Sequence, residues 1–349
     1  MNKKCTIYTF VSMLTLTLLP LGCSNNPQEN EDNDITDEYW YGGEEHQKAI
    51  SHYADALSMN STALYEDAIA ELQQAIEFDD EFSLAHSLMG SVYRKMGENE
   101  NAAVAYERAV EFDMWSFIDH LNLGQVYNVL TKYSEAIKVL KWAVMLEPKN
   151  APAHHTLSVS YYETKNYSAA KAHALKASEI DPGDEIFVAM LGNSYAKSGD
   201  HYEAITAYKK ALELNGNQPA ILTQLGNVYT KLKRFAPAHL VFEKALELDP
   251  NSANTYLAYG YCTFMEGNYN ETIKRYIQAL TLEAENAKAL NGLGATYMML
   301  YLGNKEDVQM GIDALTMWRE SLEINPHQLK IKSLEKKWTK IINLPEPVE

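Results

Sequence analysis

The sequence predicts an all-α fold in which about eight helical hairpins stack into a solenoid that ends in a capping helix. Three observations predict it: a 34-residue period that runs without insertion from residue 83 to 286, apolar residues at three- and four-residue steps within each period, and glycine or proline at the breaks. We therefore expect a repeat array rather than one globular core.

Ahead of the array, residues 1–22 have the composition of a signal peptide. Lys3 and Lys4 precede a stretch from Cys5 to Leu21 that carries no charge, which matches the basic and apolar regions of such a peptide. A membrane span needs ~20 mainly apolar residues. The Thr and Ser interruptions and Pro20 leave this stretch short, so we expect a leader that is cut away.

The end of the leader carries a short motif. Leu21-Gly22-Cys23 resembles the lipobox of bacterial lipoproteins, in which cleavage occurs before a lipid-modified cysteine. The resemblance implies that Cys23 is the first mature residue and the lipid attachment point. Pro20 stands where that family usually has Leu or another aliphatic residue, and the alternative is a plain signal peptide with a chance cysteine.

Residues 23–46 differ in composition from everything after them. Residues 24–46 hold eight acidic residues and no Lys or Arg. Low apolar content and charge of one sign predict a disordered tether between the lipid and the body. Its aromatic cluster, Tyr39-Trp40-Tyr41, is either part of the spacer or docks on a partner or on the first repeat unit.

From about residue 47 the chain repeats itself in register. A glycine recurs at one place in the first half of the units, Ser158 fills that place in another unit, tyrosine usually follows three residues later, and alanines follow after twelve and nineteen. The glycines are Gly90, Gly124, Gly192, Gly226, Gly260 and Gly294. Because a glycine inside a helix costs ~1 kcal/mol relative to alanine, we expect it to allow close packing on the small alanine of the second helix.

The repeated residues are similar to those of the tetratricopeptide repeat (TPR) family. That family's pattern is W-x2-L-G-x2-Y, then A-x3-F and a closing Pro, and L-G-x-x-Y occurs here at residues 123–127, 191–195, 225–229 and 293–297. The resemblance covers residues 47–326 and implies a right-handed superhelix. The expected units are 47–82, 83–116, 117–150, 151–184, 185–218, 219–252, 253–286 and 287–326.

The two end units depart from the pattern. The first has no glycine at the expected place, and its loop near residues 59–63 is expected to be two residues longer than the others. The last reaches Ala314, Trp318 and Pro326 only after about eight extra residues, which predicts a loop insertion near Tyr301 to Gln309. Residues 327–349 follow as an amphipathic capping helix and tail, with lysines that would solvate the open end.

No residue set in the sequence predicts catalysis, and we expect a protein that is not an enzyme and has no cofactor. The ten histidines are scattered and lack metal-ligand spacing, so we expect surface or hairpin-packing histidines and no metal site. Cys262 stands alone once Cys5 is removed and Cys23 is lipidated, so no intramolecular disulfide is expected. The net charge of −17 becomes −19 without Lys3 and Lys4 (28 basic against 47 acidic residues), which disfavours nucleic acid as a partner.

The resemblance also implies a binding groove. In the TPR family, positions two, five, nine and twelve of each unit's first helix line the concave face. Amides there could hydrogen-bond a peptide backbone, and apolar residues near the C-terminus could seat a short helix. The alternative is that these side chains are solvated or pack on the next unit. The candidate groove residues are Gln125, Tyr162, Asn193, Asn227, Leu257, Tyr261, Phe264 and Met298.

Trp142 is a second candidate contact. It stands where the other regular units place Arg, Lys or Gln, and exposed aromatic residues are enriched at interface hot spots. It would either face a partner from the outside of the array or fold back on the adjacent hairpin.

These features together predict a lipid-anchored scaffold for other proteins. With Ser24 and Asn25 after Cys23, the lipoprotein resemblance implies an outer-membrane lipoprotein that faces the periplasm, with envelope proteins or peptides as partners. The chaperone-tail clamp of some TPR proteins is absent. The alternatives are a carbohydrate-binding or enzyme-accessory subunit and a soluble secreted TPR protein. The sequence leaves the oligomeric state open.

Overall fold

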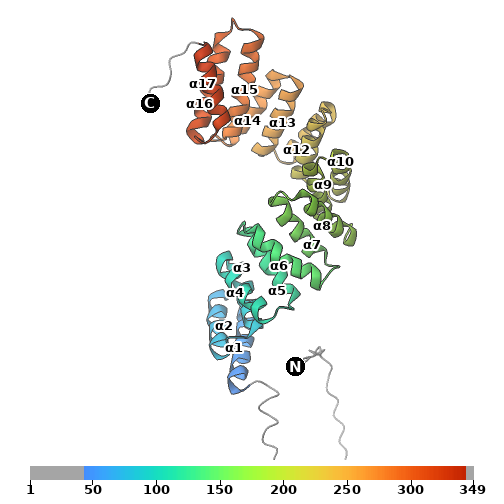
Figure 1. The fold of residues 1–349 in the computed structure, drawn as a ribbon, viewed down its shortest axis with the longest axis vertical. Coiled ribbons are helices and arrows are strands. Elements are labelled where there is room, and N and C mark those ends of the chain that lie inside the picture. The colour runs from blue at the N-terminus through green and yellow to red at the C-terminus, as the bar shows by residue number, and fades with distance from the viewer. Residues whose placement is uncertain (1–42, 343–349) are drawn as a thin grey trace, which may run out of the picture.

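The computed structural model describes residues 43–342, and within that range every regular element is a helix (Figure 1). The helices are α1 (Glu44–Ser61), α2 (Tyr65–Phe78), α3 (Ser83–Met96), α4 (Asn99–Phe112), α5 (Phe117–Val129), α6 (Tyr133–Leu146), α7 (Ala151–Glu163), α8 (Tyr167–Ile180), α9 (Glu185–Ser198), α10 (His201–Leu214), α11 (Pro219–Lys231), α12 (Phe235–Leu248), α13 (Ala253–Glu266), α14 (Tyr269–Leu282), α15 (Ala287–Gly303), α16 (Val308–Ile324) and α17 (Leu329–Ile342). Eight hairpins and one closing helix confirm the predicted all-α repeat fold.

The hairpins stack in chain order along the long axis of the molecule, from α1 at one end to α17 at the other (Figure 1). Each helix packs on its hairpin partner and on the neighbouring unit. First helices of successive units, such as α11 and α13, also contact each other, whereas second helices of successive units make few contacts or none among residues 43–342. The first helices therefore line the inner, concave side of the curved array.

Local sequence sets where the helices begin and end. Side-chain oxygens of Asn150 and Asp184 accept hydrogen bonds from the first free N–H groups of α7 and α9, as N-cap residues do. Gly97 and Gly199 end α3 and α9 at positive φ, where a glycine carries no steric penalty. In four other units a residue with a side chain, for example Lys165 at φ 62°, takes that conformation instead.

The glycine column has a different reason from the predicted one. A Cβ built on Gly226 would lie 2.6 Å from Cζ of Phe242, and one on Gly192 would lie 2.7 Å from the ring of Tyr208. Each glycine of the regular units thus makes room for the large side chain sixteen residues later, and Gly294 of the last unit makes room for Trp318, not for the alanine of the second helix. In the fourth unit both positions change together, since Ser158 replaces the glycine and Ala174 replaces the large side chain.

The first unit is more regular than the sequence suggested. Helix α1 begins at Glu44, so the last three residues of the predicted tether are helical. The loop between α1 and α2 is residues 62–64, as short as residues 130–132 and 232–234 in later units. The expected longer loop was therefore wrong, and Ala56 simply takes the glycine's place opposite Leu72, both fully buried.

The insertion in the last unit is mostly helical rather than a loop. Helices α15 and α16 have 17 residues each, three more than α13 and α14. The connection of residues 304–307 is two residues longer than residues 267–268. Of the eight extra residues, three thus lengthen α15, two lengthen the connection and three lengthen α16. Together they lengthen the hairpin against which α17 packs.

Several predictions lie outside the described residues. These are the leader, the lipidated Cys23, the tether up to residue 42 and the tail after residue 342. Among the helices from α1 to α17, none combines the length and the apolar character that crossing a membrane requires.

Candidate binding surfaces

The concave face is built from one side of each first helix. Positions two, five, nine and twelve of a unit are spaced by three or four residues, so their side chains lie on one face of a helix. Neighbouring first helices bring these faces side by side. In α5, for example, the face carries Ile118, Leu121, Gln125 and Asn128.

The predicted amides in the middle of this face are partly engaged within the protein. Oε1 of Gln125 accepts a hydrogen bond from Nη1 of Arg94 at 3.0 Å, and Oδ1 of Asn193 accepts one from the hydroxyl of Tyr208 at 2.8 Å. Both side chains are half-buried, as is Asn227. Because these internal bonds use the amide oxygens, the NH2 groups of Gln125 and Asn193 remain as donors for a peptide carbonyl.

The predicted aromatic and apolar residues divide into exposed and packed ones. Tyr261 is 49% exposed, and Tyr162 and Phe264 are half-buried against Tyr167 and Tyr269, with ring centroids 5.6 and 6.0 Å apart. Leu257 is likewise half-buried and packs on the core around Tyr276. Exposed and half-exposed rings of this kind can still meet a ligand.

Met298 does not belong to the groove. Its side chain is only 5% exposed and packs with Tyr301, Leu315 and Trp318 in the core of the last hairpin. The prediction failed because the insertion adds a turn to α15 that carries Tyr301, and because side chains of α17 pack against the same cluster.

Sequence reasoning missed a row of aliphatic side chains on the concave face. Ile50, Leu84, Ile118 and Ile186 occupy position two of the first, second, third and fifth units and are 45–57% exposed. Pro152, also exposed, takes that position in the fourth unit. The signal was present, because the TPR resemblance placed position two on the concave face and these residues follow one another at 34-residue spacing, but the candidate residues came from positions five, nine and twelve alone.

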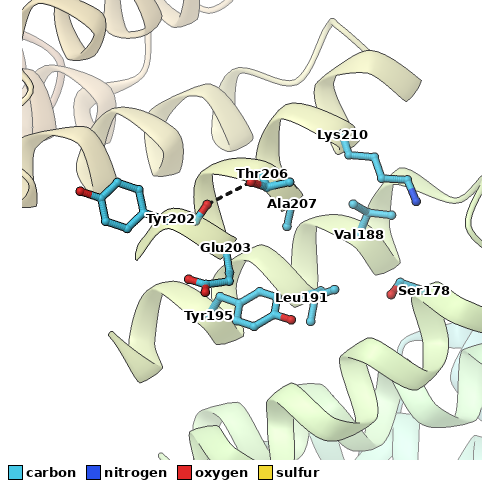
Figure 2. Close-up of a pocket in the computed structure, with 9 residues that line it drawn as sticks. All are labelled: Ser178, Val188, Leu191, Tyr195, Tyr202, Glu203, Thr206, Ala207 and Lys210. Atoms are coloured by element: carbon cyan, nitrogen blue, oxygen red, sulfur yellow. Dashed lines mark hydrogen bonds between the residues drawn. The ribbon is translucent and has the colours of Figure 1, made fainter. Parts of the chain in front are cut away.

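The outer side of the array has a groove at each of three junctions between units. The cavity between α8, α9 and α10 measures about 420 Å³; Figure 2 shows Tyr195 and Leu191 from α9 beside Thr206, Ala207 and Lys210 from α10. An equivalent cavity of about 430 Å³ is lined by His86, Tyr93 and Arg108, among others. Recurrence at the same unit positions indicates that these grooves result from stacking of the units.

Trp142 lines the third of these grooves. It is 39% exposed, and its ring stacks on His120 with centroids 6.0 Å apart and planes at 13°. This cavity of about 460 Å³ is also lined by Lys138, Met145 and Tyr161. Trp142 thus folds partly back on its own hairpin while one side stays accessible.

Three of the histidines close the turns between units. Nε2 of His86, His120 and His154 lies 2.9–3.1 Å from the carbonyl oxygen six residues earlier, in the turn that joins two units. Nδ1 of His154 also lies 3.0 Å from Nδ1 of His173. Between residues 43 and 342, no three His, Cys, Asp or Glu side chains are grouped so as to hold a metal ion.

The fourth unit contains histidines with lowered pKa values. Burial and the neighbouring His154 lower the pKa of His173 to about 4. Burial also lowers the pKa values of His154 and His155, since removal from water disfavours the charged imidazolium.

Comparison with protein families gives one match that covers most of the repeats. The family model described as the Cilia and flagella-associated protein 70 C-terminal domain, of TPR type, matches residues 46–293. The comparison with curated protein sequences gave no match.

Solved structures share the fold at low sequence identity. The crystal structure of the APC/C hetero-tetramer Cut9-Hcn1 contains a chain with a TM-score of 0.58 and 20% identity over 78% of this chain. The match spans 52% of that longer chain. A tetratricopeptide repeat protein from Parabacteroides merdae gives a TM-score of 0.56, 15% identity and coverage of 72% and 99% of the two chains. Pseudomonas aeruginosa pilF gives a TM-score of 0.50 and 22% identity, and the match covers 60% of this chain and 96% of that one.

Proposed function

The chain belongs to the family of the Cilia and flagella-associated protein 70 C-terminal domain, whose repeats are of TPR type, and on this premise we propose that it is a non-catalytic scaffold that binds a segment of another protein in its concave face. The observation that carries the proposal is the row of exposed aliphatic side chains at position two of the N-terminal units. Aliphatic side chains that stay exposed at the same position of several units cost free energy in water, and this favours a partner that covers them.

The chemistry of the face favours an extended segment over a small molecule. Aliphatic side chains recur at one unit position, and the amides of Gln125 and Asn193 each keep free donors. A segment running across successive first helices could place a side chain on each aliphatic residue and its backbone carbonyls on the amides. Tyr261 and Phe264 extend the apolar part of the face toward the C-terminus.

The proposed location follows from the leader. Lipidation of Cys23 would fix the scaffold to the outer membrane on its periplasmic side, and the acidic segment after it would set the reach of the array. The partners would then be proteins or peptides of the cell envelope. The support for this part is the sequence of residues 1–46 alone.

The test is affinity capture from membranes followed by mass spectrometry, with four forms of the chain. The wild type is compared with Cys23→Ser, with the double variant Ile118→Ser/Ile186→Ser, and with Leu240→Ser. Leu240 is a matched control because it is an exposed aliphatic residue on a second helix, away from the concave face.

We expect Cys23→Ser to leave the membrane fraction while it still captures the partner after mixing. We expect the double isoleucine variant to stay in the membrane and lose the partner, and Leu240→Ser to behave as the wild type. An unchanged membrane fraction for Cys23→Ser would refute the anchor. Equal capture by the isoleucine and Leu240 variants would refute the concave site.

A further inference from the structure

The N-terminal part of the concave face carries positive charge in an otherwise acidic protein. Across the first three units, positions two, five, nine, twelve and thirteen of the first helices include Arg94 and Lys95 and no Asp or Glu. The whole chain, by contrast, has a net charge of −17. An acidic ligand would therefore meet a local attraction on this face.

The two cations are held in place by neutral groups. Nη1 of Arg94 donates to Oδ1 of Asn122 at 3.1 Å and to Oε1 of Gln125 at 3.0 Å, while Nζ of Lys95 donates to Oδ1 of Asn60 at 2.8 Å. These five side chains come from α1, α3 and α5. Within residues 43–342 neither cation has a carboxylate partner, unlike Lys171 with Asp200 or Arg319 with Glu335.

Exposed apolar side chains lie next to this basic patch. Ile50 and Leu57 are seven residues apart on α1 and therefore share one side of the helix, and Leu84 occupies the matching place on α3. The surface thus combines aliphatic residues near the start of α1 with two oriented cations near its end.

The chain itself supplies a segment of matching chemistry. Residues 29–41, ENEDNDITDEYWY, contain six carboxylates, no cation and the aromatic cluster, and they end two residues before α1. From the start of α1 to Asn60 is ~24 Å at the rise of an α-helix. An extended chain covers that distance in roughly eight residues, so the carboxylates from Asp32 to Asp37 are within reach of the cations and Trp40 is within reach of Ile50.

We propose that residues 29–41 lie on the concave face of the first three units, with carboxylates at Arg94 and Lys95 and the aromatic cluster on Ile50 and Leu57. The segment is an internal occupant that a partner must displace. Its placement rests on charge, reach and exposure, while its regulatory effect rests on the proposed function.

The test uses the full chain with the photocrosslinker benzoylphenylalanine in place of Trp40, followed by mass spectrometry of the crosslinked peptides. We expect intramolecular crosslinks from position 40 to peptides of α1 or α3. The double variant Arg94→Gln/Lys95→Gln should lower their yield roughly fivefold, the scale expected when two exposed ion pairs are lost. Salt at 0.5 M should have a similar effect, because it screens such pairs.

The matched control is Lys209→Gln/Lys210→Gln, which removes two adjacent exposed lysines from α10 on the outer side and should leave the yield unchanged. Circular dichroism melting confirms that each variant is folded. The proposal would be overturned by crosslinks to other parts of the chain, between copies, or only to another protein. Equal crosslink yields for Arg94→Gln/Lys95→Gln and Lys209→Gln/Lys210→Gln would overturn it as well. If position 40 does not crosslink to the face and Ile118→Ser/Ile186→Ser still loses its partner, the internal occupant fails while the proposed function stands.

Discussion

At the residue scale, a steric pair recurs in most of the hairpins. A residue without a Cβ on the first helix faces a large side chain sixteen residues later, as Gly226 faces Phe242 and Gly124 faces Leu140. Ser158 and Ala174 show that the two positions vary together. The free energy that a helical glycine costs is offset by burial of a whole ring, since Phe242 is fully buried.

This pairing predicts non-additive mutations. Gly226→Ala should lower stability by ~1–3 kcal/mol through overpacking, and Phe242→Ala by ~3–5 kcal/mol through the cavity. The double variant Gly226→Ser/Phe242→Ala, which copies the fourth unit, should be more stable than the sum of Gly226→Ser and Phe242→Ala by at least ~1 kcal/mol. Urea unfolding of the wild type and these four variants measures the coupling, and strict additivity would contradict the pairing.

At the element scale, the lengthened last hairpin holds the closing helix. Tyr301, in the added turn of α15, lies edge-to-face on Trp338 of α17, with ring centroids 6.4 Å apart. Nε of Arg319 in α16 donates to Glu335 at 2.8 Å and thereby fixes the same side of this helix one turn earlier. The insertion thus builds a seat for α17 at the point where the repeat pattern ends.

Removal of that contact should release α17 alone. Tyr301→Ala deletes a buried aromatic side chain, which costs ~3–5 kcal/mol, and this loss should appear as faster hydrogen exchange in α17 with little change in α13 and α14. Leu302→Ala is the control, because Leu302 is its exposed neighbour. Equal effects of the two substitutions, or loss of protection along the whole array, would show that the insertion does not serve the closing helix.

The elements were predictable to the degree that the period holds. Between residues 83 and 286, glycine, tyrosine and alanine columns fix which residues are helical, because each unit repeats the same local chemistry. The sequence was misread where one unit differs from the rest: the eight extra residues near Tyr301 carry no proline and extend two helices, and Met298 was consequently assigned to the groove. The exposed row that includes Ile118 was missed although position two was expected on the concave face, because the sequence alone does not show which residues of that face stay exposed.

At the scale of the whole molecule, stability passes from unit to unit through neighbouring interfaces, as in other solenoids. The fourth unit, near the middle of the array, holds three histidines with lowered pKa values, His154, His155 and His173. It is also the unit with Ser158 in place of glycine, whose hydroxyl is buried without a hydrogen-bond partner among the described residues. We therefore expect acid to destabilise the centre of the array.

Acid should uncouple the two halves of the array before it unfolds them. The pKa of His173 is about 4 in the folded chain, below its ordinary 6.5, so the unfolded state binds more protons between these values. The stability contribution is present above pH 6.5 and is lost as the pH falls toward 4. Hydrogen exchange at pH 7 and pH 5 should show early loss of protection in α7 and α8.

The variant His173→Gln should reduce the pH dependence of hydrogen-exchange protection in α7 and α8. His327→Gln, at an exposed position, should leave that pH dependence unchanged. Simultaneous loss of protection in all units, or an unaltered pH dependence in the His173 variant, would contradict a weak centre.

The steric pairs have a consequence for how such an array can change in evolution. Because both members of a pair belong to one hairpin, duplication or loss of a complete 34-residue unit keeps every pair intact. A crossover inside a unit would not: joining the helix of Ser158 to the helix of Phe242 would set a hydroxymethyl group against a phenyl ring. The hairpin, bounded by its turns, is thus the smallest segment that recombination can exchange without a steric cost.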